Sequence, residues 1–294
     1  MQKRKIGVFF AYIGVILLSI GGSVQATETT SLEEAKADKT QTYVVSQDGT
    51  GDYQSIQEAV NASKSGDTIL IHPGVYYESV KIYGKMLNLQ GTEKESCIIQ
   101  YDGNDYENPP LDMASGTVSN LTIQALTMDT EISEGRQAYA VHIDKEQYGS
   151  KDTVFRNCRI ISETSACFGI GLWGDQHIYI EDCEIVSKSY TPNIYIHDVE
   201  FPPYGGKAWF TMERCVLERD SYGYVILAHA ILPSNLVHIT FKDVQDVYAE
   251  DLGNSKVCTE NKFDAEGFGW CGLNNMFLTE ESQNNSIDEM NYDF

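Results

Sequence analysis

The sequence predicts an all-β chain that folds as a right-handed parallel β-helix with a short N-terminal capping helix, and three observations lead to this prediction. A single amphipathic helical pattern lies near the start of the presumed domain. Short runs rich in Ile, Val and Tyr follow it, and these are typical of β-strands. A loose recurrence of one polar, one small and one aliphatic residue then continues through the chain, as stacked coils would require.

The first 26 residues have the layout of a cleavable secretory signal. Three basic residues precede an apolar run over residues 6–20, and Ala26 is a small residue of the kind that signal peptidases accept. A retained membrane anchor is the alternative, which we rank second because no other segment of comparable length is apolar. We therefore expect a secreted protein, located extracellularly or at the cell surface, with no membrane contact after cleavage of residues 1–26.

The chain is strongly acidic, with a formal net charge of −22 that becomes −25 without residues 1–26, because that segment holds three cations and no anions. Nucleic acid is excluded as a partner, since phosphate binding requires clustered Lys and Arg. The charge also disfavours a densely anionic polysaccharide, although salt screens the interactions of surface charges beyond roughly 8 Å at physiological ionic strength. A neutral or esterified glycan suits this balance better.

The remaining chain is long enough for one domain, and its hydrophobic content of 42% is ordinary for a globular protein. Residues 27–40 and 279–294 are polar, acidic and without apolar periodicity. We interpret them as an acidic linker and an acidic tail. The β-helix domain is predicted to occupy residues 41–278, and we expect a monomer.

The predicted helix lies in YQSIQEAVNAS, where apolar residues recur at helical spacing from Ile56 to Val60. Ser55 and Glu58 have the S-x-x-E form of a capping box. The runs TILI, VYYESVKI and MLNLQG follow as strands.

The recurrence that predicts the coils consists of NLTI at 120, NCRI at 157, DCEI at 182, RCVL at 214 and KDVQ at 242. Stacking these segments would place Cys158, Cys183 and Cys215 in one inward-facing ladder, because a solenoid residue lies above its counterpart in the previous coil. A β-sandwich is the competing architecture, but its turns recur about every 8–12 residues. The recurrence here is two to three times longer.

The chain has seven cysteines, and their spacing resembles no small disulfide scaffold. Buried structural thiols are the favoured interpretation for the ladder. Cys258 and Cys271 flank a loop and are the best candidates for a disulfide. Neither C-x-x-C nor H-E-x-x-H occurs, so we expect no metal site and no cofactor.

Residues 45–82 resemble the opening of the pectinesterase (pectin methylesterase) family, which belongs to the pectin lyase-like β-helix superfamily. The matching pieces are D-G-T-G-D-Y, S-I-Q-E-A-V and G-D-T-I-L-I-H-P-G-V-Y-Y-E. QAYAVHI, NCRI, DCEI and VYAEDLGN also resemble segments of that family, so the resemblance runs from about residue 43 to about residue 254. It implies the β-helix fold and a pectin-like ligand, with Glu78 as a structural residue.

Hydrolysis of a methyl ester by covalent catalysis needs a carboxylate nucleophile, a second carboxyl that shuttles the proton, and amide donors for the oxyanion. By resemblance, Gln137 helps to hold the oxyanion. Asn193 stands where the family has its nucleophilic aspartate, and His229 stands in place of its arginine. The position of the proton-shuttling aspartate falls on Ser165 or Cys167. A degenerate, non-catalytic member that binds glycan is therefore favoured over an active esterase.

Relocated carboxylates are the route by which esterase activity would survive, and Glu163, Asp175 and Asp198 are the candidates. In a period-two strand, Asn193 and Tyr195 would share one face and Asp198 would lie on the other. Asp198 would thus replace the nucleophile if the strand ends before it.

Two further interpretations remain open. His197 and His229 would share a proton with a nearby carboxylate if they lie on neighbouring coils, which would suit a polysaccharide lyase or glycosidase on the same scaffold. Isolated surface histidines are the simpler interpretation.

For the aromatic residues, sugar binding and core filling carry equal weight. The predicted substrate-binding residues are Trp173, Tyr195, Tyr204 and Trp209, and the expected partner is pectin or a related plant cell-wall polysaccharide.

Overall fold

The structure is a computed structural model of the chain. It describes residues 39–102, 108–126, 139–143, 151–163, 165–171, 175–188, 192–197, 207–219, 226–230, 236–248, 256–266, 269–273 and 288–289. The chain separates into two compact units, Met1–Lys39 and Thr40–Phe294, and the description below concerns the second. The predicted signal over residues 1–26, and almost all of the predicted linker and tail, lie outside the described residues and stay predictions.

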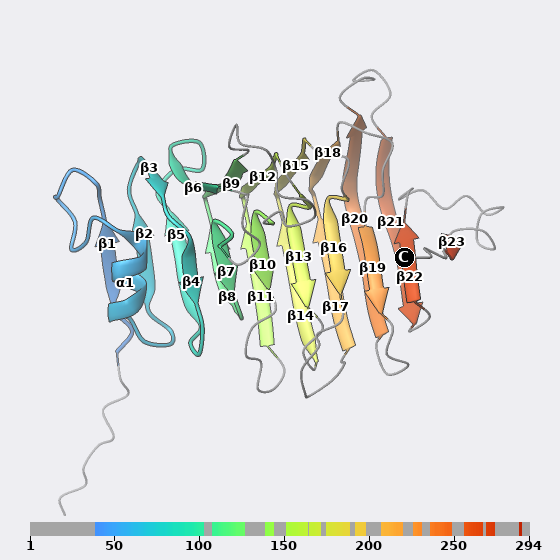
Figure 1. Ribbon diagram of the computed structural model, residues 1–294, viewed down its shortest axis with the longest axis horizontal. Coiled ribbons are helices and arrows are strands. Elements are labelled where there is room, and N and C mark those ends of the chain that lie inside the picture. The colour runs from blue at the N-terminus through green and yellow to red at the C-terminus, as the bar shows by residue number, and fades with distance from the viewer. Residues whose placement is uncertain are drawn as a thin grey trace, which may run out of the picture. The chain divides into compact units, whose positions relative to one another are not determined.

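The compact unit is a parallel β-helix built from two sheets (Figure 1). In spatial order, the 15-stranded sheet, called sheet A, contains β1 (Thr42–Val45), β2 (Thr68–Ile71), β5 (Leu87–Gly91), β8 (Gly116–Ser119), β11 (Lys151–Arg156), β14 (Gln176–Glu181), β17 (Lys207–Glu213), β20 (Leu236–Tyr248), β18 (Val216–Arg219), β15 (Glu184–Ser187), β12 (Arg159–Ser162), β9 (Thr122–Leu126), β6 (Cys97–Asp102) and β3 (Gly74–Tyr77), with β21 (Lys256–Glu266) paired antiparallel to β20. The 8-stranded sheet, called sheet B, contains β4 (Val80–Ile82), β7 (Leu111–Met113), β10 (Val141–Ile143), β13 (Phe168–Gly171), β16 (Ile194–His197), β19 (Ile226–Ala230), β22 (Gly269–Leu273) and β23 (Asp288–Glu289).

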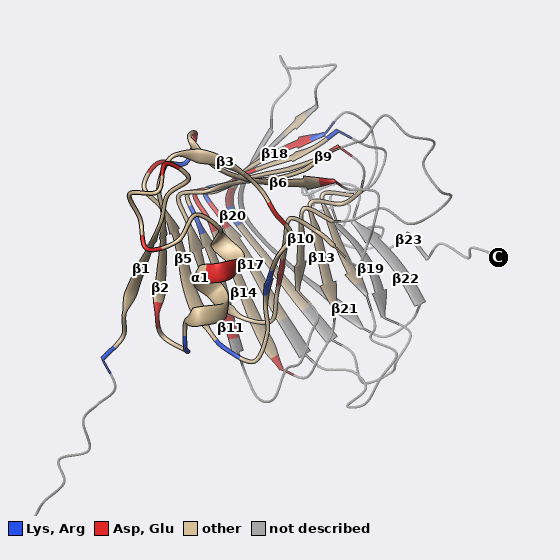
Figure 2. Cartoon of the chain, turned by 60° about the vertical axis from the view of Figure 1, so that its left-hand side comes forward, with Lys and Arg blue, Asp and Glu red and all other residues tan. Residues whose placement is uncertain are grey.

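A typical coil contributes one strand to sheet B and two strands to sheet A, as β10, β11 and β12 do. Figure 2 shows the result: sheet A folds into two walls, one containing β3, β6 and β9 and the other containing β5 and β14, while β10 and β13 of sheet B form a third wall. Neighbouring coils pair in parallel, as a right-handed β-helix requires. The predicted fold class is therefore confirmed.

The predicted capping helix is α1 (Ile56–Ala62), which contacts β1, β2 and β4 and buries Ile56, Ala59 and Val60. Its N-cap is Ser55, whose side chain accepts a hydrogen bond from the backbone N–H of Glu58, as the S-x-x-E pattern predicts.

The other N-terminal donors of α1 are satisfied by Glu78, which the sequence resemblance marks only as structural. Its carboxylate accepts hydrogen bonds from Ser55 Oγ at 2.8 Å, Ile56 N at 3.0 Å and Gln57 N at 2.9 Å. A carboxylate at this position suits both the free N–H groups and the positive end of the helix. Glu78 thus joins the end of β3 to the start of α1.

The polar residues of the recurrence form the turns between the two walls of sheet A. They have a positive φ of about 50°, a conformation that Asn and Asp tolerate best among residues with a side chain. These residues are Asn120, Asn157, Asp182, Arg214 and Asp243. The fifth repeat therefore begins at Asp243, one residue later than the Lys242 that the sequence alignment of KDVQ suggests.

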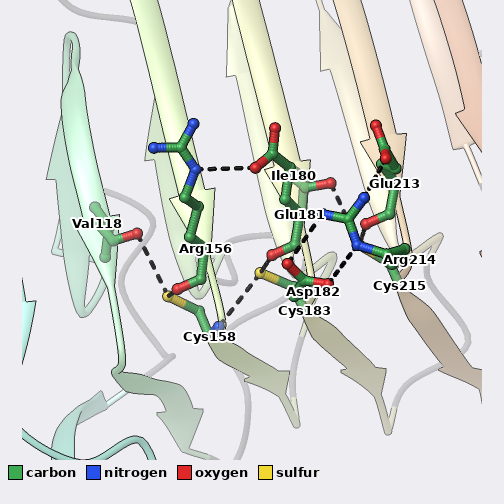
Figure 3. Close-up of polar contacts among 10 residues, drawn as sticks. All are labelled: Val118, Arg156, Cys158, Ile180, Glu181, Asp182, Cys183, Glu213, Arg214 and Cys215. Atoms are coloured by element: carbon green, nitrogen blue, oxygen red, sulfur yellow. Dashed lines mark hydrogen bonds and ion pairs between the residues drawn. The ribbon is translucent and has the colours of Figure 1, made fainter.

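The residue after each of these turns points into the solenoid, and three of the five are the predicted cysteines (Figure 3). Cys158, Cys183 and Cys215 are buried, and the backbone N–H of Cys158 donates to Cys183 Sγ at 3.3 Å. On the outside of the same turns, Arg214 pairs in a bidentate manner with Asp182, at 2.7 and 3.0 Å. The inward cysteine ladder is confirmed, and the burial of its thiols agrees with the structural interpretation.

Among the residues that the structure describes, no helix is both long and apolar enough to cross a membrane.

Candidate functional site

The candidate site is a row of side chains on the outer face of sheet B, which we call the outer column. The column consists of Lys81 on β4, Asp112 on β7, His142 on β10, Gly169 on β13 and Tyr195 on β16, which are partners in the register of successive strands. The strand neighbours on both sides of each are buried hydrophobic residues of the core. The period-two alternation of the strands therefore aligns these five positions along the outside of the solenoid.

A carboxylate and an imidazole meet in this column. Asp112 Oδ1 lies 3.6 Å from His142 Nδ1, and Asp112 Oδ2 accepts a short hydrogen bond from the hydroxyl of Tyr83. The Asp112 side chain is fully buried, whereas His142 keeps 10% of its side-chain surface exposed although its Nδ1 is buried. Burying a carboxylate is costly unless polar partners compensate it. Tyr83 is such a partner through its hydrogen bond, whereas the 3.6 Å between His142 Nδ1 and Asp112 Oδ1 becomes an ion pair when the imidazole is protonated. The exposed part of His142 is where this pair reaches the surface.

The imidazole of this pair belongs to a stack of three aromatic rings. The ring of Tyr139 lies over Gly169, where an added Cβ would come within 2.2 Å of Tyr139 Cδ2. Its centroid is 5.4 Å from the imidazole of His142 and 6.1 Å from the ring of Tyr195, at interplanar angles of 27° and 28°. Tyr139 thus takes the place of the side chain that Gly169 lacks. Because stacked rings cover one another's faces, the stack offers ring edges, where the aromatic quadrupole is positive.

Asn193, the residue at the predicted nucleophile position, lies inside the solenoid. Its side chain is fully buried, and Nδ2 donates to the carbonyl oxygens of Ile185 at 3.3 Å and Glu218 at 3.2 Å. A bend precedes β16, so Asn193 turns inward while Tyr195 turns outward. The expectation that Asn193 and Tyr195 share a face was therefore wrong, because the period-two rule does not extend past the end of the strand.

Cys167, one of the two residues at the predicted shuttle position, is also part of the core. Its thiol donates to the carbonyl oxygen of Val186 at 3.2 Å, and burial raises its pKa far above the ordinary value of a thiol. Ser165, the other residue at that position, donates its backbone N–H to Ser162 Oγ at 3.1 Å.

Two of the three candidate relocated carboxylates, Glu163 and Asp175, lie at strands of sheet A and not in the outer column. Glu163 follows β12 of sheet A, where Oε1 accepts from Gln124 Nε2 at 3.0 Å and lies 3.4 Å from Lys188 Nζ. Asp175 is exposed just before β14, also in sheet A. Asp112, which the sequence interpretation did not consider, is a buried carboxylate that the structure places beside an aromatic stack.

Gln137, Asp198, Trp173 and Tyr204 lie outside the described residues, so their predicted roles stay predictions. For His197 and His229 the backbone alone is described. They are partners in the register of β16 and β19, so the two histidines do occupy neighbouring coils.

Trp209 lies on sheet A rather than with Tyr195 on sheet B. Its indole stacks between the imidazoles of His177, at 4.5 Å and 11°, and His238, at 5.6 Å and 21°. Because β14 and β20 flank β17, the two imidazoles cover opposite faces of the ring. Trp209 therefore has no free face on which a sugar would stack. Trp209 and Tyr195, the two predicted binding residues that the structure describes, do not form one surface.

Cys258 and Cys271 are placed by their backbones on β21 of sheet A and β22 of sheet B, and their pairing stays a prediction. Within the described ranges, no three His, Cys, Asp or Glu side chains are gathered as the ligands of a metal ion would be.

No family model matches the chain, and no curated protein matches it. Solved structures similar to it include a pectin methylesterase from the rice weevil, at 18% identity and a TM-score of 0.48, covering 73% of this chain and 65% of that one. A pectin methylesterase in complex with a hexasaccharide has 17% identity and a TM-score of 0.47, covering 71% and 66%. The Erwinia chrysanthemi enzyme has 15% identity and a TM-score of 0.43, covering 61% and 55%.

The chain thus spans about half to two thirds of the length of these proteins. Similarity at this level is a likeness of the fold alone.

Proposed function

We propose that this chain binds a pectin-like polyuronide along the outer face of sheet B and does not hydrolyse its methyl esters through an aspartate nucleophile. The observation that supports this most directly is the stack of His142, Tyr139 and Tyr195, which lies next to the buried carboxylate of Asp112. The sequence resemblance of residues 45–82 to pectinesterases supports the choice of ligand.

The stack suits an extended polysaccharide because it runs along the solenoid axis. Neighbouring coils are spaced about 4.8 Å apart, so a linear glycan on this face would cross the side chains of several coils in turn. The ring edges carry partial positive charge, which suits the oxygens of a sugar or of a carboxylate. The tyrosine hydroxyls add hydrogen-bonding groups.

The absence of an aspartate nucleophile is argued from the two positions that the resemblance assigns to catalysis. Asn193 is an amide, and its side chain is bound to main-chain carbonyls inside the solenoid. Cys167 is a buried thiol held in its protonated form by the rise of its pKa. Neither position supplies a carboxylate that a substrate would reach, and this favours binding over covalent catalysis.

The proposal includes export, since pectin is an extracellular polymer. It relies for this on the signal-like residues 1–26, and detection of the mature N-terminus after Ala26 in culture medium would test it.

Binding is tested by titrating the purified protein with esterified pectin and with polygalacturonate, using dextran as the neutral control. Tyr195→Ala should weaken binding about 2- to 13-fold, since an aromatic contact contributes ~0.5–1.5 kcal/mol. Tyr179→Ala is the matched control, because Tyr179 is also half-buried and stacked beside a histidine, but on sheet A. Equal loss in the two variants, or loss with Tyr179→Ala alone, would contradict the location of the site.

The absence of aspartate-nucleophile catalysis is tested with the same preparations. We expect no methanol release from esterified pectin above the blank, no unsaturated uronide products and no new reducing ends. Methanol release that Asp112→Asn abolishes would show an esterase at this site. Unsaturated products or new reducing ends would instead show the lyase or glycosidase that is the alternative on this scaffold.

A further inference from the structure

We propose that the outer column recognises the free carboxylate of its uronide ligand, with His142 as the residue that determines this specificity through its charge. This inference rests on the proposed function, because it concerns the same face of sheet B. It goes further in naming the acidic, unesterified form of the polymer as the preferred ligand when His142 is protonated.

The charges of the column are placed in a fixed order. Lys81, Asp112 and His142 are register neighbours on β4, β7 and β10, so successive members lie about one coil, roughly 4.8 Å, apart. Lys81 Nζ donates to the neutral amide oxygen of Asn108 at 2.7 Å. With a neutral imidazole, the cation of Lys81 and the anion of Asp112 cancel. With an imidazolium, the same three residues have a formal charge of +1.

His142 is the member of the outer column with an imidazole, the side chain whose ordinary pKa lies nearest to physiological pH. The described groups that face it are Asp112 on β7, Tyr139 ahead of β10 and Tyr195 on β16, with the Tyr83 hydroxyl behind Asp112. Tyrosines ordinarily titrate near pH 10 and carboxylates near pH 4, whereas a histidine ordinarily titrates near pH 6.5. Protonation of His142 is thus the change that makes this stretch of the surface cationic.

This local cation is needed because the whole chain repels a polyanion. The formal net charge is −22, yet charges are screened beyond about 8 Å at physiological ionic strength, so the groups next to the ligand dominate. Asp112 is fully buried, whereas His142 keeps part of its side chain exposed, so a ligand on the surface is nearer to the imidazole than to this carboxylate. A methyl ester removes the charge of the ligand, so esterified pectin gains nothing from protonation of His142.

The test compares two polymers, two pH values and three proteins. Polygalacturonate and highly methyl-esterified pectin are titrated at about pH 5.5 and about pH 8, values on either side of the histidine range, against wild type, His142→Gln and His177→Gln. His177 is the matched control, because it is a stacked, half-buried histidine in register with an aspartate, Asp152, but on sheet A. Comparison with His177→Gln shows how far protonation of the acidic protein as a whole changes the binding of the polymer.

Wild type should bind polygalacturonate about tenfold more tightly at the lower pH, which equals about 1.4 kcal/mol, and His177→Gln should keep that ratio. In His142→Gln the ratio of polygalacturonate affinities at the two pH values should fall to about the ratio for esterified pectin, whose binding changes little with pH. A His142→Gln protein with the wild-type ratio overturns the inference while leaving the proposed function intact. Failure of wild type to bind either polymer at either pH overturns the proposed function instead.

The number of protons taken up on binding distinguishes a role of the His142 charge from a merely structural role, because a structural role would not change it. Calorimetric titration with polygalacturonate near pH 7, in buffers of different ionisation enthalpy, should show uptake of a substantial fraction of one proton per site in wild type. Esterified pectin should show none. This comparison uses the unaltered protein, so it decides the question even if His142→Gln fails to fold. Equal proton uptake with the two polymers refutes recognition of the carboxylate by His142.

Discussion

Replacement of Gly169 by alanine tests the aromatic stack without changing any charge or hydroxyl. An added Cβ would lie 2.2, 2.3 and 2.6 Å from Tyr139 Cδ2, Cε2 and Cγ, which is far inside van der Waals contact. The φ of Gly169 is not in the left-handed region, so the backbone itself accepts alanine. The ring of Tyr139 must therefore leave its place between His142 and Tyr195.

The size of the effect follows from three contributions. Overpacking a filled site costs typically ~1–3 kcal/mol. The two ring pairs that Tyr139 makes contribute ~0.5–1.5 kcal/mol each, or ~1–3 kcal/mol together. The ring either stays and overpacks the site or leaves and loses these pairs, so the two ranges measure one cost and are not added. Alanine is favoured over glycine within a strand by ~0.5–1 kcal/mol, which offsets part of the loss. Gly169→Ala should therefore lower the free energy of unfolding by about 1–2 kcal/mol.

A double-mutant cycle with Tyr139→Ala tests whether the cost of Gly169→Ala comes from its clash with the Tyr139 ring. Once the ring is gone, the alanine methyl has space, and Gly169→Ala should become neutral or stabilising by up to about 1 kcal/mol. The coupling energy from urea unfolding of the four proteins should be about 2 kcal/mol. Gly169→Ala and Tyr139→Ala should also weaken polyuronide binding equally. An equal cost of Gly169→Ala in the two backgrounds would refute the placement of the ring.

Three further predictions concern the scaffold. Glu78→Gln removes the charge from a group that accepts three hydrogen bonds at the start of α1, and should lower the free energy of unfolding by about 1–3 kcal/mol in urea. Gly91→Ala should cost about 3 kcal/mol or more, because its Cβ would lie 2.0 Å from the backbone oxygen of Asn120, which cannot rotate away; wild-type stability would contradict this. Hydrogen bonds from the Thr50 hydroxyl, the Ser46 hydroxyl and the Thr50 N–H lower the pKa of Asp48 to about 2, so this contribution to stability is present above about pH 4 and lost as the pH falls towards 2. In Thr50→Val an NMR titration should place the Asp48 pKa nearer its ordinary value of 3.8, and an unchanged midpoint would contradict the assignment.

The scaffold was predictable because its signals are local and repeated. The residues after the turns, such as Cys158 and Cys183, are small and apolar because they point inward, and the turn residues Asn120 and Asn157 are of the type that tolerates a positive φ. Arg214 is not of this type, and the fifth turn residue, Asp243, is followed by Val244 where three of the other turns have a cysteine. The alignment of the fifth repeat was accordingly one residue off.

The candidate site was less predictable because its members meet through register. Nothing in the sequence around Asp112 marks it as the neighbour of His142, since the coils differ in length and the pairing becomes visible only in the register of β7 and β10. Tyr139 and Gly169 are likewise joined by a contact between coils. The prediction for Asn193 failed for a local reason. The alternation of a strand was applied to this residue, which lies one position before the start of β16.

Two outer faces of this β-helix carry similar side chains in different settings, and the difference explains why we place the function on sheet B. On sheet A, His177, Trp209 and His238 stack in register, and the described aspartate in that row, Asp152, is exposed. On sheet B, the aspartate in register with His142 is fully buried. Water screens the exposed carboxylate, whereas a buried one acts on its imidazole through a medium of lower dielectric constant. We therefore propose that charge is coupled to ligand binding on sheet B, whereas the same residue types on sheet A mainly pack against one another.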